Sequence, residues 1–185
     1  MKIKVVSDLH LEFADINITN DENCDVLILS GDIIVAADIG RPDPNNFMEG
    51  ARSQRIRNFF DRVSAAFPHV IMIMGNHEHY GGDFAKGRNR WDNFCNQYYI
   101  SNIRMLDKET VKIGDYEFIG GTLWTDFNDM DSYTMFHAEQ AMNDYKGVKN
   151  TNDTTSWKFL PKHSLSDHCK MVGYLADRKS TRLNS

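Results

Sequence analysis

Three short runs of apolar residues in the first half of the chain each end in a cluster of polar residues. They are "IKVV" at residues 3–6, "VLIL" at residues 26–29 and "VIMIM" at residues 70–74. Continuous apolar runs of this length are typical of strands that are buried on both faces, as in a parallel sheet. We therefore predict three buried strands.

Between the second and third runs, apolar residues recur at the spacing of a helix. The segment "SQRIRNFFDRVSAAF", residues 53–67, places its isoleucine, valine and phenylalanines on one side, and Ser53 is a plausible N-cap. A strand, a helix and a second strand in this order form a right-handed parallel crossover.

The later part of the chain changes character. Apolar and polar residues alternate on both sides of Gly114-Asp115, which predicts a β-hairpin over 110–121. Further helices are expected over about 83–98, over 131–143 and over 164–176, with a polar loop at 144–157. The pattern predicts an α/β fold in which a mixed sheet follows a parallel one.

Length and composition are those of one soluble globular domain. The chain has 185 residues, 41% of them hydrophobic and 25% charged. We assign residues 1–176 to the domain. Residues 177–185, "DRKSTRLNS", interrupt the helical pattern after Ala176 and are interpreted as a tail that does not belong to the natural protein.

Charge and cysteine content limit the partners and the compartment. A net charge of −5 gives no reason to expect bulk nucleic-acid binding, although a nucleotide substrate remains compatible with it. No apolar run approaches the ~20 residues that span a bilayer, so we expect no membrane association. Three widely spaced cysteines favour a reducing compartment, and we expect a cytoplasmic protein.

The polar clusters that follow the three strands contain candidate metal ligands. Asp8 and His10 follow the first strand, Asp32 the second, and Asn76 and His77 the third. In an extended backbone, Asp8 and His10 would point to the same side. Because ligands bind beyond the carboxyl ends of parallel strands, we expect all five side chains to converge. Their oxygen and nitrogen donors suit Mn, Fe, Zn or Mg.

The blocks "DLH", "GDI" and "GNHE", in this order and each at a strand end, resemble the first signature blocks of the calcineurin-like metallophosphoesterases. The later segments "GGTLWTDF" and "AMNDY" are similar to small bacterial or phage-borne members. The resemblance extends from Met1 to about Ala176. It implies a four-layer αββα sandwich of mixed sheets and metal-dependent hydrolysis of a phosphomonoester or phosphodiester, with a small molecule or a nucleotide as substrate.

The resemblance also implies a role for each site residue. Asp8 and His10 would bind a first divalent metal ion, Asp32 would bridge two ions, and Asn76 would bind the second through its side-chain oxygen. A hydroxide bridging the ions would attack phosphorus directly. His77 would lie near the leaving group and donate a proton or stabilise charge.

The sequence departs from the family pattern in one respect. The family continues with blocks resembling "THH" and "GHxH", and neither occurs in these 185 residues. We therefore expect the C-terminal part of the fold and several histidine ligands to be missing. Two alternatives stay open: an inactive fragment, and a non-catalytic interaction module on the same fold.

Other polar and aromatic residues have ordinary explanations that we favour. His163 and His168 lie five apart in or beside a helix, so they are expected to be structural rather than replacement ligands. Glu78 is expected to be solvated. His79 and Trp124 could line the site, but a polar loop explains the first equally well and a core position explains the second better.

Overall fold

The computed structural model describes residues 1–39, 47–98 and 100–183, and its centre is a parallel sheet. The sheet has the strand order β1 (Ile3–Val6), β2 (Val26–Ser30), β3 (His69–Ile73) and β4 (Ile103–Met105), and all three pairings are parallel. The three predicted strands are therefore confirmed. The short strand β4 joins the sheet beside β3.

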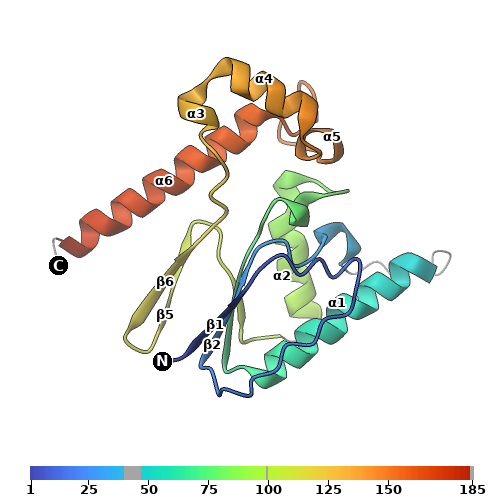
Figure 1. Cartoon of the computed structure of the whole chain (residues 1–185), viewed down its shortest axis with the longest axis vertical. Coiled ribbons are helices and arrows are strands. Elements are labelled where there is room, and N and C mark those ends of the chain that lie inside the picture. The colour runs from blue at the N-terminus through green and yellow to red at the C-terminus, as the bar shows by residue number, and fades with distance from the viewer. Residues whose placement is uncertain (40–46, 99, 184–185) are drawn as a thin grey trace.

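Helices α1 (Phe47–Ala66) and α2 (Gly87–Gln97) cover one face of this sheet (Figure 1). The side chains of Phe59 and Phe60 from α1 and Trp91 from α2 are buried with Leu29 and Met72 from the strands in one core. The apolar residues whose spacing predicted these helices are thus the residues that are buried against the sheet.

The predicted starts of both helices are wrong. Helix α1 begins at Phe47, so Ser53 lies within it and does not cap it. A separate 3₁₀ turn, η3 (Phe84–Lys86), precedes α2, and the side chain of Asp83 accepts a hydrogen bond from the backbone nitrogen of Ala85 at its start.

The predicted hairpin lies on the other face of the parallel sheet. Strands β5 (Glu109–Ile113) and β6 (Tyr116–Gly120) pair antiparallel around Gly114, whose φ of 58° is a left-handed conformation that glycine adopts easily. Side chains of the hairpin, including Val111 and Phe118, pack against Ile71 and Leu106 of the parallel-sheet side.

Helix α6 (Pro161–Leu183) contacts the hairpin from outside. The hydroxyls of Tyr174 and Thr110 lie 2.7 Å apart, and Lys108 donates a hydrogen bond to Asp167 at 3.0 Å. The layers therefore follow the order helix, sheet, sheet, helix (Figure 1), with a second sheet of two strands in the described residues. The mixed α/β fold agrees with the prediction.

The remaining elements are short. They are η1 (Ala36–Asp38), η2 (His77–His79), α3 (Phe127–Met130), α4 (Ser132–Ala141) and α5 (Asp144–Gly147). The predicted loop at 144–157 is wrong at its start, because α5 forms there and buries Tyr145 with Phe159.

The predicted end of the last helix at Ala176 is also wrong, since α6 continues to Leu183. The assignment of residues 177–185 to a non-native tail stays a prediction, and residues 184–185 lie outside the described residues. In the described part of the chain, no helix is long and apolar enough to cross a membrane.

Candidate metal centre

The loops that follow β1, β2 and β3 meet at the carboxyl edge of the parallel sheet. The backbone nitrogen of Asp8 donates to the carbonyl of Gly31 at 3.1 Å, and that of His10 donates to the carbonyl of Asp32 at 3.1 Å. These hydrogen bonds continue the pairing of β1 and β2 beyond the strands. They hold the first two predicted ligand loops side by side.

Asp8, His10 and Asp32 all have positive φ angles, of 54°, 46° and 54°. Residues with a Cβ adopt this left-handed conformation at an energetic cost, and such conformations cluster at functional sites. The expectation that extended backbone aims Asp8 and His10 to one side is therefore wrong. A turn at each residue determines the direction of its side chain.

The side chains of Asp8, His10 and Asp32 come together as expected. One ligand atom from each lies within 4.8 Å of the others. Two carboxylates and an imidazole at this separation form a donor set that suits a divalent ion such as Mn, Fe, Zn or Mg. Asp8 is exposed, and the other two are half-buried, so the group is open to solvent on one side.

Two glycines allow the loops after β2 and β3 to approach this closely. A Cβ on Gly75 would lie 2.2 Å from Asp32 Oδ1, and a Cβ on Gly31 would lie 2.9 Å from Gly75 Cα. Gly31 also has a φ of 89°. The glycines of the "GDI" and "GNHE" blocks therefore make room for the backbone of one loop against the other.

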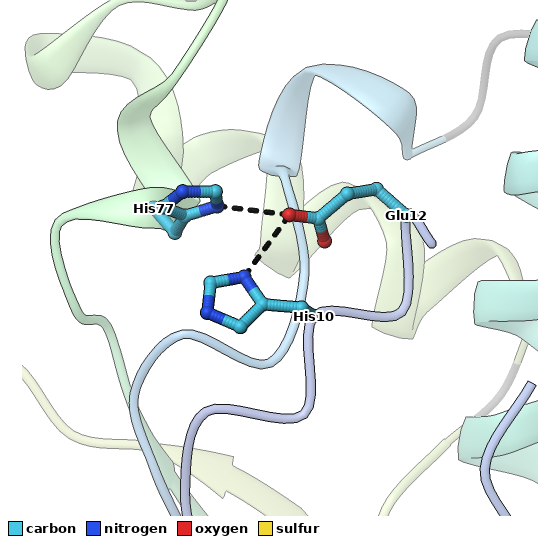
Figure 2. Close-up of side chains that lie close together, drawn as sticks. All are labelled: His10, Glu12 and His77. Carbon is cyan, nitrogen blue, oxygen red and sulfur yellow. Dashed lines mark hydrogen bonds and ion pairs between the residues drawn. The ribbon is translucent and has the colours of Figure 1, made fainter. Parts of the chain in front are cut away.

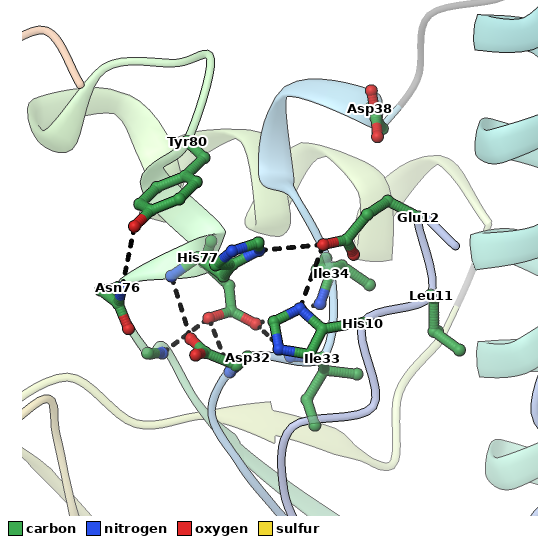
Figure 3. A network of polar contacts seen from close by, with 12 residues as sticks. His10, Leu11, Glu12, Asp32, Ile33, Ile34, Asp38, Asn76, His77 and Tyr80 are labelled. Atoms are coloured by element: carbon green, nitrogen blue, oxygen red, sulfur yellow. Dashed lines mark hydrogen bonds and ion pairs between the residues drawn. The ribbon is translucent and has the colours of Figure 1, made fainter. Parts of the chain in front are cut away.

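The loop after β3 brings Asn76 and His77 to the same edge. The backbone nitrogen of His77 donates to Asp32 Oδ1 at 2.9 Å. The side-chain nitrogen of Asn76 donates to the hydroxyl of Tyr80 at 3.3 Å, and that hydroxyl donates to Asp144 at 3.3 Å. In Figure 3 the side-chain oxygen of Asn76 points away from Tyr80, which leaves it available to a ligand.

Glu78 is buried rather than solvated, so the expectation for this residue is wrong. Its carboxylate accepts hydrogen bonds from the backbone nitrogens of Asp32, Ile33, Ile34 and Gly75 at 2.7–3.1 Å. Burial raises the pKa of Glu78 to about 7, although the four backbone donors act in the opposite direction. Glu78 ties the loop after β2 to the loop after β3.

Glu12 is a site residue that the sequence motifs did not single out. Its side chain is buried, and His10 Nδ1 donates to its Oε1 at 3.1 Å (Figure 2). His77 Nδ1 lies 2.9 Å from the same oxygen. The alternation of Asp8, His10 and Glu12 gives no valid signal for it, because the backbone at Asp8 and His10 is left-handed and not extended.

His79 and Trp124 belong to an aromatic cluster beside the site. The His79 ring lies 4.9 Å from that of Phe84 and 6.1 Å from that of Trp124, centroid to centroid. Burial lowers the pKa of His79 to about 4. The core interpretation of Trp124 agrees with its packing against Phe84 and Phe159.

His163 and His168 make structural contacts. His163 Nε2 lies 3.0 Å from Asp153 Oδ2, and His168 Nδ1 donates to the carbonyl of Leu123 at 2.7 Å. Neither belongs to the groups of potential metal ligands found among the described residues.

A family model of the calcineurin-like phosphoesterases matches residues 1–183, and the chain belongs to this family. The predicted family is thereby confirmed.

Two individual proteins are similar to this chain. An uncharacterized protein of Acanthamoeba polyphaga mimivirus is 26% identical over 195 residues, covering 95% of this chain and 62% of its own length. The crystal structure of a phosphopantetheinyl hydrolase from Mycobacterium tuberculosis superposes with a TM-score of 0.55 at 16% identity, covering 96% of this chain and 62% of that one. This chain thus spans about three fifths of the length of both.

Proposed function

We propose that this protein is a metal-dependent hydrolase of phosphomonoesters or phosphodiesters, acting on a small molecule or a nucleotide. The observation that carries the proposal is the gathering of ligand atoms from Asp8, His10 and Asp32 within 4.8 Å of one another at the carboxyl edge of the sheet. Membership of the calcineurin-like phosphoesterase family supports the choice of phosphate esters as the substrate class.

The ligands divide between two ions in this proposal. Asp8 and His10 would hold the first ion, Asp32 would serve both ions, and Asn76 would hold the second through its side-chain oxygen. Two divalent ions, of Mn, Fe, Zn or Mg, would supply a hydroxide at neutral pH and neutralise charge on the phosphate. Tyr80 supports this role of Asn76, because it engages the amide nitrogen and so fixes which atom faces the ions.

His77 acts on the leaving group in this proposal. Its backbone nitrogen is held by Asp32, and its ring packs edge-on against that of His10 with centroids 4.4 Å apart. The His77 ring therefore lies beside the ring of the proposed metal ligand His10. A protonated imidazole there can donate its proton to the departing oxygen and stabilise its charge.

The compartment proposed is the cytoplasm. Cys24, Cys95 and Cys169 are all free, and sparse unpaired cysteines are typical of a reducing environment.

Hydrolysis of two model substrates tests the proposal. The protein is stripped of metal, reloaded with Mn²⁺, and assayed with p-nitrophenyl phosphate as the monoester and bis(p-nitrophenyl) phosphate as the diester. We expect Mn²⁺-dependent release of nitrophenolate from at least one. Asp32→Ala should lower the rate at least ~100-fold, since even residues that only support ligands contribute about 10–100-fold.

Asp115→Ala is the matched control, because this aspartate lies exposed in the turn of the hairpin. It should leave the rate unchanged. The proposal is wrong if neither ester is hydrolysed in the presence of metal, or if Asp32→Ala is as active as the control.

A further inference from the structure

The carboxylate of Asp144 is buried beside the candidate metal centre, and no step proposed so far uses it. Asp144 is 3% exposed and begins α5, in the later part of the chain. Its Oδ2 accepts a hydrogen bond from the hydroxyl of Tyr80, 64 positions earlier, at 3.3 Å. Its Oδ1 is buried and has no hydrogen-bond partner among the described residues. Burial of a carboxylate with so few partners costs stability, so its contact with Tyr80 calls for a functional reason.

Tyr80 connects Asp144 to two residues of the candidate centre. The side-chain nitrogen of Asn76 donates to the Tyr80 hydroxyl at 3.3 Å, and Figure 3 shows the hydroxyl directed at this amide. The ring of Tyr80 also lies 4.2 Å from the ring of His77, centroid to centroid. Tyr80 therefore contacts both residues that the loop after β3 supplies to the proposed reaction.

The directions of the two hydrogen bonds determine how the amide of Asn76 is turned. A tyrosine hydroxyl has one hydrogen, and Tyr80 donates it to Asp144. Toward Asn76 the hydroxyl can then only accept, and an amide side chain donates through its nitrogen alone. The nitrogen of Asn76 therefore faces Tyr80, and its oxygen is turned away from the hydroxyl (Figure 3).

We propose that Asp144 is a positioning residue of the candidate metal centre, which acts through Tyr80 to keep the side-chain oxygen of Asn76 available to the second ion. Without the Asp144 carboxylate, the Tyr80 hydroxyl is free to rotate and to donate its hydrogen to that oxygen. The amide of Asn76 can then turn either end toward the ion. The proposal rests on the proposed function, because it needs Asn76 to be a metal ligand.

A positioning role and a structural role of Asp144 predict different results. Asp144 joins the later part of the chain to the loop after β3, so a structural role would make its loss harmful whichever residue stands at position 76. A positioning role matters only while an amide, which has one oxygen and one nitrogen, stands there. A carboxylate at position 76 presents an oxygen to the ion whichever way it turns.

Binding of Mn²⁺ to the metal-free protein, measured by electron paramagnetic resonance of the free ion, tests the proposal in a double-mutant cycle. Asn76→Ala identifies the binding step that depends on this ligand. We expect Asp144→Ala and Tyr80→Phe each to weaken the same step about 10-fold or more. Combined with Asn76→Asp, Asp144→Ala should change the affinity by no more than about 2-fold.

Rescue and control variants accompany the cycle. Asp144→Asn keeps an acceptor oxygen for the Tyr80 hydroxyl and should bind Mn²⁺ within about 2-fold of the wild type. Asp115→Ala and Tyr116→Phe are the matched controls, because both residues lie exposed at the hairpin, and they should leave binding unchanged. If Asp144→Ala does not fold, Tyr80→Phe, which removes only the hydroxyl, decides the same question.

Several results would overturn the proposal. Weakened binding in Asn76→Ala with unchanged binding in Asp144→Ala would do so and would leave the proposed function in place. An equal loss from Asp144→Ala with and without Asn76→Asp would assign Asp144 a structural role. If Asn76→Ala leaves Mn²⁺ binding unchanged, Asn76 is not a ligand and the proposal fails with that assignment. Absence of phosphoester hydrolysis together with the expected Mn²⁺ affinities would contradict the proposed function alone.

Discussion

The parallel-sheet region, residues 1–105, and the later region, residues 106–183, differ in how they bury apolar side chains. The first packs its helices on the sheet in one continuous core. The second has a smaller cluster of buried side chains around Phe127, Tyr145 and Phe159, and leaves the large side chains of Tyr133, Phe136 and Trp157 more than half exposed. Every proposed metal ligand comes from the first region.

The later region touches the site at few points. Thr122 donates to the carbonyl of Met74 at 2.6 Å, and Asp144 accepts from Tyr80 at 3.3 Å. The geometry of the candidate metal centre therefore depends on the packing of the parallel sheet, whereas the later region contacts the outer side of this centre.

Removal of a core ring should show the largest contrast between the regions. Phe60 is fully buried against Phe59 and Trp91, so Phe60→Ala should lower the free energy of unfolding by about 3–5 kcal/mol. Phe136 is 59% exposed in the later region, and Phe136→Ala should change it by less than about 0.5 kcal/mol. Chemical denaturation measures both values, and equal losses would contradict the contrast.

His79 lies where the two regions meet and should make stability depend on pH. Its pKa is lowered by burial to about 4 from an ordinary 6.5. The unfolded chain therefore takes up a proton as pH falls below 6.5, while the folded protein does not until about pH 4. The stabilisation is complete above pH 6.5 and is lost as pH falls toward 4, by about 3 kcal/mol in total.

His79→Leu removes this titration. The difference in unfolding free energy between wild type and variant should shift by about 3 kcal/mol against the wild type between neutral pH and about pH 4. A difference that stays constant with pH would show that His79 is not held in its neutral form.

Two glycine substitutions sharpen the comparison at the backbone. Gly75→Ala places a Cβ 2.2 Å from Asp32 Oδ1 and should cost about 1–3 kcal/mol of stability as well as metal affinity. Gly173 lies in the exposed part of α6 with nothing within 4 Å of a Cβ, so Gly173→Ala should stabilise by about 0.5–1 kcal/mol. Thermal unfolding distinguishes the signs, and tolerance of Gly75→Ala would mean that the loops do not meet as closely as described.

The elements and ligands predicted from sequence are those that depend on short, continuous patterns. The apolar runs ending at Val6, Leu29 and Met74 predicted the strands, and parallel strand ends brought Asp8, His10 and Asp32 together. The argument for Asp8 and His10 from extended backbone was nevertheless wrong, because the turns at strand ends set their directions.

The roles of Glu12 and Glu78 could not be predicted with the same ease. Glu78 accepts hydrogen bonds from the backbone nitrogens of Ile34 and Ile33, 44 and 45 positions away. These nitrogens come close to Glu78 only once the two loops have folded together. The extension of α6 past Ala176 was missed for a different reason. Residues 177–183 have no apolar residues at helical spacing, but they also contain no glycine or proline that would end a helix.

Binding of Mn²⁺ to the metal-free protein tests the central claim most directly. The claim is that the strand-end cluster holds divalent ions, and electron paramagnetic resonance of free Mn²⁺ measures it. We predict saturable binding that Asp8→Ala weakens at least ~100-fold and that Asp115→Ala leaves unchanged. No saturable binding by the wild type, or equal binding by wild type and Asp8→Ala, would contradict the account.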